Sequence, residues 1–281
     1  MLQRIYRGFA IALALTITTI ATAQDVPRIL VLTKSAGFQH SVVKNDADGS
    51  DHVTRILQEL ADMGGAELVS TKDASMINAE TLKTFNLVIF YTTGILTTEK
   101  GDKSPGMSDT AMQELLDWIA TGGGFMGYHC ASDTFHQADR KPSPYIEMLG
   151  GEFITHGAQF RGTVKVVDES HPAMAATPQN WKINDEWYIF KNFNKKNIHV
   201  LAMLDPGLAR RTQDKYDIPD YPITWVSTHG EGRIYYNAQG HREDVWTNED
   251  FQQTVIAAAT WAMGEGPAQA EPNYKTVTKK K

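Results

Sequence analysis

The chain has little cysteine, no excess of positive charge and few long apolar segments. Cys130 is its one cysteine among 281 residues, so no disulfide can form within the chain and packing must stabilise the fold. The formal net charge is -6 and the pI is about 5.8, and no stripe of lysine and arginine occurs before the C-terminal tail. These features argue against nucleic acid and anionic membranes as partners.

The one extended apolar segment lies at the N-terminus. Arg4 and Arg7 precede an apolar stretch over residues 8–20, which is followed by Ala21-Thr22-Ala23. This order is typical of a secretory signal peptide, here residues 1–23, with cleavage before Gln24. The stretch is shorter than the roughly 20 apolar residues of a membrane span. We therefore expect an exported mature protein, periplasmic or secreted, with no membrane span.

Strand and helix patterns alternate along the mature chain. Continuous aliphatic runs at 28–33 and 86–91 predict buried parallel strands. Residues 50–63 lie between them and place apolar side chains on one face of a helix. This alternation predicts an α/β fold with a doubly wound, mostly parallel sheet. The domain is expected to span residues 24–264, and residues 265–281, which end in three lysines, a flexible tail.

The second half of the chain adds further elements to this pattern. The aromatic-rich segment 171–187 is interpreted as loop structure. The remaining patterns predict helices at 142–149 and 248–263 and strands at 162–167, 198–204, 223–227 and 233–237.

A glycine-rich stretch in the middle of the chain is predicted to carry the site. Helical spacing over residues 109–120 ends at three glycines and is followed by a short apolar strand, Phe125–Tyr128. His129 and Cys130 then emerge at the carboxyl end of that strand, where ligands bind in open α/β sheets. The alternative for each residue is a structural histidine and a small buried thiol.

Three other histidines occur in similar settings. His40, His156 and His241 each follow an apolar segment or flank a glycine. Loops at strand ends converge on one edge of an α/β sheet, and several imidazoles near an acid form a metal site or an acid/base site. No compact helical motif such as H-x-x-x-H connects these histidines, so their spacing leaves both interpretations open.

An ordered series of motifs covers most of the mature chain. The motifs are Gly37-Phe-Gln-His-Ser41, Gly127-Tyr-His-Cys-Ala-Ser-Asp133, Gly150-Gly-Glu-Phe-Ile-Thr-His156, Asp185-Glu-Trp-Tyr188, Pro222-Ile-Thr-Trp225 and Gly232-Arg-Ile-Tyr-Tyr-Asn-Ala-Gln-Gly-His241. The series resembles the trehalose-utilisation (ThuA-like) family over about residues 28–264. The resemblance implies a flavodoxin-like fold of the class I glutamine amidotransferase-like superfamily. It also implies a role in carbohydrate metabolism, where family members are associated with 3-keto sugars and glycosides.

The predicted elbow departs from the amidotransferases of that superfamily. They place a cysteine at the apex of a Gly-x-Cys-x-Gly turn, whereas this chain places His129 there and Cys130 one residue later. A catalytic thiolate also needs a nearby base and an electropositive pocket. We therefore do not expect glutamine hydrolysis at Cys130, and an amidotransferase-like hydrolase is the weaker alternative.

The chemistry that fits the resemblance is acid/base elimination or hydrolysis of a keto-glycoside, with or without a divalent metal ion. We hypothesise that His129, His156 and Glu186 are catalytic. His40 and His241 would polarise the substrate or bind the metal together with His129 and His156.

Four more residues complete the expected substrate site. Asp133 would orient an imidazole. The aromatic rings of Tyr128, Trp187 and Tyr188 would stack on a sugar ring or belong to the core. The alternative for Glu186 is a solvated turn, and the alternative for the whole site is a module that binds a carbohydrate without cleaving it. The substrate linkage, the metal and the oligomeric state stay open at this stage.

Overall fold

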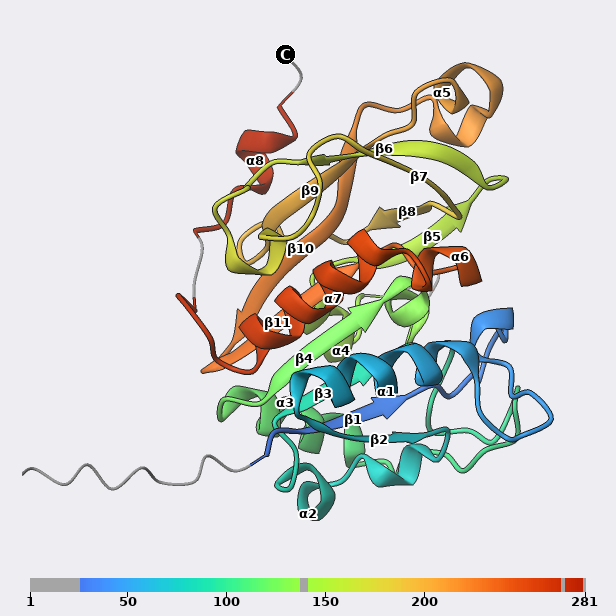
Figure 1. Cartoon of the computed structure of the whole chain (residues 1–281), viewed down its shortest axis with the longest axis vertical. Helices are drawn as coiled ribbons and strands as arrows, with labels where there is room; N and C mark the ends of the chain where they lie inside the picture. The colour runs from blue at the N-terminus through green and yellow to red at the C-terminus, as the bar shows by residue number, and fades with distance from the viewer. Residues whose placement is uncertain (1–25, 137–140, 269–270, 280–281) are drawn as a thin grey trace, which may run out of the picture.

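The structure, a computed structural model, describes residues 26–136, 141–268 and 271–279. Within these residues, nine strands form one mixed sheet in the order β2-β1-β3-β4-β11-β10-β9-β6-β7, and β5 and β8 form a separate pair. Figure 1 shows α1 and α7 crossing in front of the sheet, with α3 and α4 behind it.

The elements have the following bounds. The strands are β1 Arg28–Leu32, β2 Glu67–Thr71, β3 Leu87–Phe90, β4 Gly124–Tyr128, β5 Glu152–His156, β6 Phe160–Val166, β7 Trp181–Asp185, β8 Tyr188–Lys191, β9 His199–Asp205, β10 Tyr221–His229 and β11 Gly232–Asn237. The α-helices are α1 His52–Gly64, α2 Ala79–Leu82, α3 Ala111–Ala120, α4 Pro144–Leu149, α5 Ala209–Thr212, α6 Glu243–Trp246, α7 Glu249–Ala262 and α8 Tyr274–Val277. The 3-10 helices are η1 Ser41–Val43, η2 Ala74–Met76, η3 His129–Asp133, η4 Pro172–Met174 and η5 Asp214–Tyr216.

The first half of the sheet is parallel, as the aliphatic runs predict. Strands β2, β1, β3, β4 and β11 all run in the same direction. Every residue of β3 and β4 is buried, because helices cover both faces of a doubly wound sheet. The predicted α/β fold with a flavodoxin-like, mostly parallel core is confirmed.

The helix after β1 shows how local sequence sets an element's limits. Asp51 caps α1 by accepting the N–H of Thr54, and Gly65 ends it with a left-handed φ of 70°. The buried side chains of α1 lie on one face, as predicted for residues 50–63, and they include Val53 and Leu57. The apolar stripe therefore fixes which face of this helix meets the sheet.

The second half of the sheet is antiparallel and ends in a strand that the sequence does not predict. Strands β10, β9, β6 and β7 pair antiparallel in that order. The loop interpretation of residues 171–187 is wrong for β7. There Trp181 and Ile183 are buried and alternate with polar residues, which is the period of a half-buried strand. Four successive antiparallel pairings lead from β11 to β7, so the carboxyl end of β7 lies at the same edge as those of β4 and β11.

The described part of the expected tail contacts the sheet. Arg233 donates hydrogen bonds to the carbonyl oxygens of Glu265 and Gly266. The side chain of Asn273 exchanges hydrogen bonds with the backbone N–H and C=O of Val200 in β9. A side chain of the sheet thus satisfies backbone groups of the tail, and a side chain of the tail satisfies backbone groups of the sheet.

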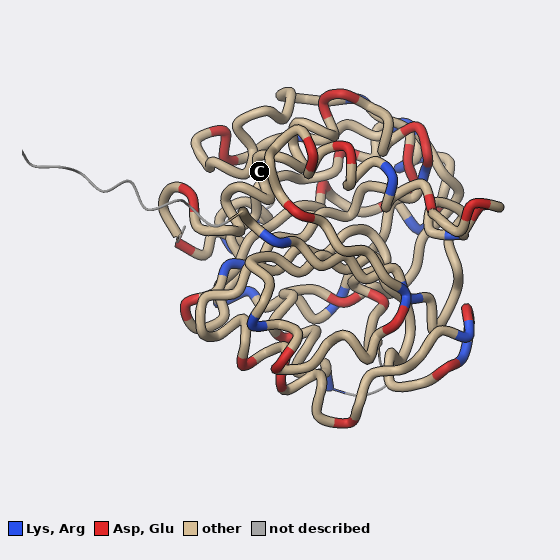
Figure 2. Tube along the Cα trace, turned by 60° about the horizontal axis from the view of Figure 1, so that its bottom comes forward, with Lys and Arg blue, Asp and Glu red and all other residues tan. Residues whose placement is uncertain are grey.

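Charge and hydropathy add two observations about the described residues. Lysine and arginine positions lie scattered between acidic ones along the trace (Figure 2). No helix in the described ranges combines the length and the apolar character that crossing a bilayer requires.

Backbone contacts join three loops at the carboxyl edge of the sheet. Isolated bridges link Ser35 to Thr93 and Gly94 to Thr134, which connects the loops after β1, β3 and β4. Gly94 has a φ of 76°, and a Cβ built there would lie 2.6 Å from the backbone nitrogen of Gly37. The loops approach so closely that only glycine fits at position 94.

We predict that Gly94→Ala destabilises the protein more than Gly49→Ala does. Both glycines have a positive φ, but a Cβ at Gly49 meets no atom within 4 Å. Gly49→Ala should cost about 1–2 kcal/mol of unfolding free energy through its backbone conformation. Gly94→Ala should cost roughly 1–3 kcal/mol more through the steric clash. Urea denaturation of the two variants tests this, and equal losses would contradict the close approach.

Candidate functional site

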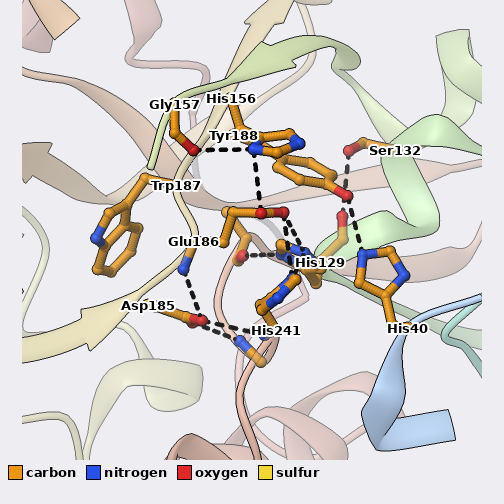
Figure 3. A network of polar contacts seen from close by, with 12 residues as sticks. His40, His129, Ser132, His156, Gly157, Asp185, Glu186, Trp187, Tyr188 and His241 are labelled. Carbon is orange, nitrogen blue, oxygen red and sulfur yellow. Dashed lines mark hydrogen bonds and ion pairs between the residues drawn. The ribbon is translucent and has the colours of Figure 1, made fainter. Parts of the chain in front are cut away.

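Four side chains from four loops converge at the carboxyl edge of the sheet. His40 follows β1, His129 follows β4, Glu186 follows β7 and His241 lies four residues after β11. One ligand atom from each residue lies within 4.8 Å of the other three, and Figure 3 shows the side chains pointing toward one another. We name these four residues the histidine cluster. It occupies the position where ligands bind in open α/β sheets.

His129 sits at the apex of a sharp turn, as the sequence predicts. Its φ is +43°, a conformation that residues other than glycine rarely adopt. Its side chain is fully buried, and Nδ1 lies 2.9 Å from the carbonyl oxygen of Ala238. Because a carbonyl only accepts, Nδ1 must carry the hydrogen. The lone pair of Nε2 therefore faces the cluster.

Glu186 is the carboxylate at the centre of these contacts. Its Oε2 lies 3.2 Å from Nδ1 of His241 and 3.6 Å from Nε2 of His129. Those two nitrogens are 3.3 Å apart. The side chain of Glu186 is only 10% exposed, so the solvated-turn alternative for this residue is wrong.

His40 closes the cluster from the side of β1. It is 3% exposed, and its Nε2 lies 3.3 Å from the hydroxyl of Tyr188. Its Nδ1 is buried without a hydrogen-bond partner among the described residues. A buried polar atom in that state costs free energy unless a ligand satisfies it.

The donor set fits a divalent metal ion such as zinc. Ligand atoms that bind such an ion at about 2.0–2.1 Å lie about 3.3 Å apart in a tetrahedral site. The separations of 3.2, 3.3 and 3.6 Å among Glu186, His129 and His241 are close to that edge length. The backbone-fixed tautomer of His129 is a further feature of a metal site.

His156 lies beside the histidine cluster and is not one of its members. Its Nδ1 lies 3.1 Å from Oε1 of Glu186 and 3.0 Å from the carbonyl oxygen of Gly157. Both partners accept, so Nδ1 carries the hydrogen and Nε2 keeps its lone pair. The side chain is 41% exposed. The geometry thus places Glu186 among the candidate ligands in place of the expected His156, whose imidazole is oriented by Glu186 and Gly157.

Burial and the central carboxylate set the protonation states of the cluster. Burial lowers the pKa of His129, and burial together with the neighbouring imidazoles lowers the pKa of His40 to about 2. Burial also disfavours the charged form of Glu186, but the imidazoles of His129 and His241 outweigh it and hold its pKa well below the usual range. Burial likewise opposes protonation of His241, yet Glu186 raises its pKa overall. The cluster therefore combines a carboxylate with the neutral imidazoles of His40 and His129, the forms that bind a cation, whereas Glu186 favours the protonated form of His241.

A family model described as ThuA, trehalose utilisation, matches residues 28–262. The chain belongs to the ThuA family. Among solved structures, a ThuA-like protein of Bacteroides uniformis has a TM-score of 0.66 at 20% identity, over 90% of this chain and 98% of the other. A ThuA-like protein of Parabacteroides merdae has a TM-score of 0.63 at 14% identity, over 87% and 92%.

The fold also occurs as part of larger proteins. A β-galactosidase of Rahnella sp. R3 matches with a TM-score of 0.52 at 12% identity, over 88% of this chain and 32% of that enzyme. At this identity the likeness concerns the fold alone. Among curated proteins, none matches this chain significantly.

Asp185 is a site residue of this ThuA-family protein that sequence reasoning missed. Its carboxylate is fully buried and accepts the backbone N–H groups of Glu186, Gly240 and His241 at 2.9, 2.7 and 3.2 Å. Burial raises its pKa to about 7 against the opposing effect of these donors. One buried carboxylate thus joins the two loops that carry Glu186 and His241. Its place beside Glu186 in an acidic pair was the available signal.

Two of the expected substrate residues are core residues that do not reach the cluster. Tyr128 is fully buried and its ring packs against those of Trp246 and Phe251. Trp187 is also fully buried and points away from the cluster in Figure 3. Both belong to the core, because large aromatic rings there contribute most to packing.

Of the two remaining expected substrate residues, Asp133 lies away from the cluster imidazoles and Tyr188 reaches them. Burial raises the pKa of Asp133 to about 6, and the titratable groups that interact with it are His136 and Glu152, not an imidazole of the cluster. Tyr188 does reach the site, because its ring centroid lies 4.1 Å from that of His129. Its hydroxyl faces His40.

Cys130 of this ThuA-family protein lies in the hydrophobic core. The residue is 1% exposed. Burial and the nearby Asp133 carboxyl group raise the pKa of its thiol well above the ordinary value. A thiol in this state is a poor nucleophile, so the expectation against a catalytic cysteine agrees with the structure.

We predict that Asp185→Asn weakens metal binding by this ThuA-family protein about 10- to 100-fold, the range for a partner that orients ligands. In the variant, an NH₂ group replaces one of the two oxygens of Asp185 that accept backbone N–H groups, so two donors face each other. The substitution should lower the free energy of unfolding by about 1–3 kcal/mol. Calorimetric zinc titration and urea denaturation measure the two effects. Asp73→Asn is the control, because Asp73 accepts the N–H of Ser75 in an exposed turn. Equal zinc affinity in both variants would contradict the role.

Proposed function

We propose that this protein is an exported carbohydrate-active enzyme that acts on a 3-keto sugar or glycoside. The reaction is acid/base elimination or hydrolysis assisted by a divalent metal ion. The observation that carries the proposal is the histidine cluster, in which three imidazoles and Glu186 meet, with the oriented base His156 beside it. A site with cation ligands and an accessible base at a sheet edge fits catalysis better than simple retention of a ligand.

Two arguments support the substrate class. The family is described by trehalose utilisation, which is carbohydrate-related. The motif resemblance connects the family with oxidised sugars that carry a keto group at C3. A ketone makes the neighbouring C2–H acidic, so such a sugar needs a base and a group that stabilises negative charge on the ketone oxygen.

The residues of the site can fill these roles. His40, His129, Glu186 and His241 would hold a divalent cation, which would supply a Lewis acid for a carbonyl oxygen. His156 offers Nε2 as the base, while Glu186 and the carbonyl of Gly157 fix its other nitrogen. The carboxylate also stabilises the imidazolium that forms when His156 takes up a proton.

The proposed elimination balances without a further reactant. His156 removes the proton at C2, the electron pair of that bond forms a double bond between C1 and C2, and the bond from C1 to the aglycone oxygen breaks. The aglycone oxygen leaves with its electron pair and receives the proton from His156. Water added later across the double bond completes the hydrolysis. Microscopic reversibility lets the same imidazole direct that water.

We expect the purified protein to contain a divalent metal ion and to release the aglycone from 3-keto-glucosides. A panel with p-nitrophenol and glucose as aglycones is followed with and without chelator, and metal content is measured alongside. Loss of turnover with chelator and recovery with added zinc would support the proposal. Sugar-dependent thermal stabilisation without cleavage of any glucoside would sink it in favour of a sugar-binding module.

Two substitutions distinguish the proposed role of His156 as the base from the proposed role of the histidine cluster in metal binding. His156→Gln should lower kcat about 100-fold or more, the range for general acid–base catalysis, and should retain the metal. Glu186→Gln should lose both metal and activity, because it removes the central carboxylate. His229→Gln is the control, since this residue lies at the β10–β11 turn on the opposite edge. Full activity of His156→Gln would exclude this residue as the base.

A further inference from the structure

We infer that Phe38 is a sugar-stacking residue, which takes the apolar face of the pyranose ring at the edge of the histidine cluster. This inference rests on the proposed function and names a determinant of its substrate binding. Phe38 is 69% exposed and is the one aromatic residue among the exposed large apolar side chains of the described chain. A solvent-exposed aromatic ring offers an apolar surface to a partly apolar ligand.

Phe38 borders the cluster directly. Its ring lies edge-on to that of His40, with centroids 5.0 Å apart and an interplanar angle of 89°. The ring of His40 in turn lies 5.0 Å from that of His129 and 5.1 Å from that of His241. The ring of Phe38 is therefore separated from the imidazoles of His129 and His241 by the ring of His40 alone.

The backbone that carries Phe38 is held in place before any ligand binds. The carbonyl oxygen of Phe38 accepts a hydrogen bond from the Thr93 hydroxyl at 2.8 Å. The N–H of Gly37 lies 3.2 Å from the carbonyl oxygen of Thr93, and Gly94 packs closely against this same segment. A fixed loop loses little conformational freedom on binding, which favours affinity.

The chemistry of a pyranose suits this ring. One face of the sugar presents C–H groups with partial positive charge, and the face of an aromatic ring is negative. The sequence predicts either such stacking or a core position for Tyr128, Trp187 and Tyr188, and all three are buried, Tyr188 with 3% exposure. Phe38, in contrast to these three side chains, exposes most of its surface.

Three substitutions of Phe38 test the inference in the full-length metal-loaded protein. Phe38→Ala should raise KM for a 3-keto-glucoside about tenfold and leave kcat within about twofold. Phe38→Tyr should behave like the unaltered protein, because it keeps the ring. Phe38→Leu should resemble Phe38→Ala, since it keeps apolar bulk without a π face. Met63→Ala is the control, because Met63 is 70% exposed at the C-terminal end of α1, away from the carboxyl edge of the sheet.

Direct titration separates this inference from the proposed function. Calorimetry with aglycone-free 3-keto-glucose should give about tenfold weaker binding to Phe38→Ala than to Met63→Ala. Unchanged KM and affinity in Phe38→Ala, with an active parent protein, would overturn the stacking role and leave the proposed function standing. If the parent protein neither binds nor cleaves the keto sugar, the proposed function fails first, and the stacking role fails with it.

Discussion

Burial of one carboxylate among several imidazoles is the interaction on which this site depends. Glu186 would be costly to bury alone, since an ionised group loses its hydration. The imidazoles of His129, His156 and His241 each place a nitrogen within 3.6 Å of its oxygens. In turn, Glu186 determines where these histidines can lie, and a cation in the cluster would relieve the remaining cost.

The fold supplies this interaction through strand ends that meet at one edge. Four loops from distant parts of the chain carry the cluster, and they need fixed positions because metal ligands tolerate little displacement. Two devices provide this. The buried carboxylate of Asp185 joins the loops of Glu186 and His241. Close packing at Gly94 joins the loops after β1, β3 and β4.

The residues that sequence reasoning placed correctly share a local signature. His129 follows a glycine-rich elbow, and His40 and His241 follow buried strands, so the rule for strand ends in α/β sheets locates them. The misplaced residues lack such a signature. Tyr128 and Trp187 are aromatic residues next to site residues, but neighbouring side chains point in different directions, and both rings enter the core. Exposed Phe38 escaped notice because exposure is a tertiary property.

The sequence by itself determined the parallel α/β core, the position of the elbow and the family, because hydrophobic periodicity and ordered motifs are local properties of the chain. Only the tertiary structure decided that Glu186, and not His156, completes the cluster with His40, His129 and His241. It also decided that Asp185 holds the loops together. Those facts depend on distances between residues more than 50 positions apart, and such distances follow from strand order and packing, which spacing along the chain does not specify.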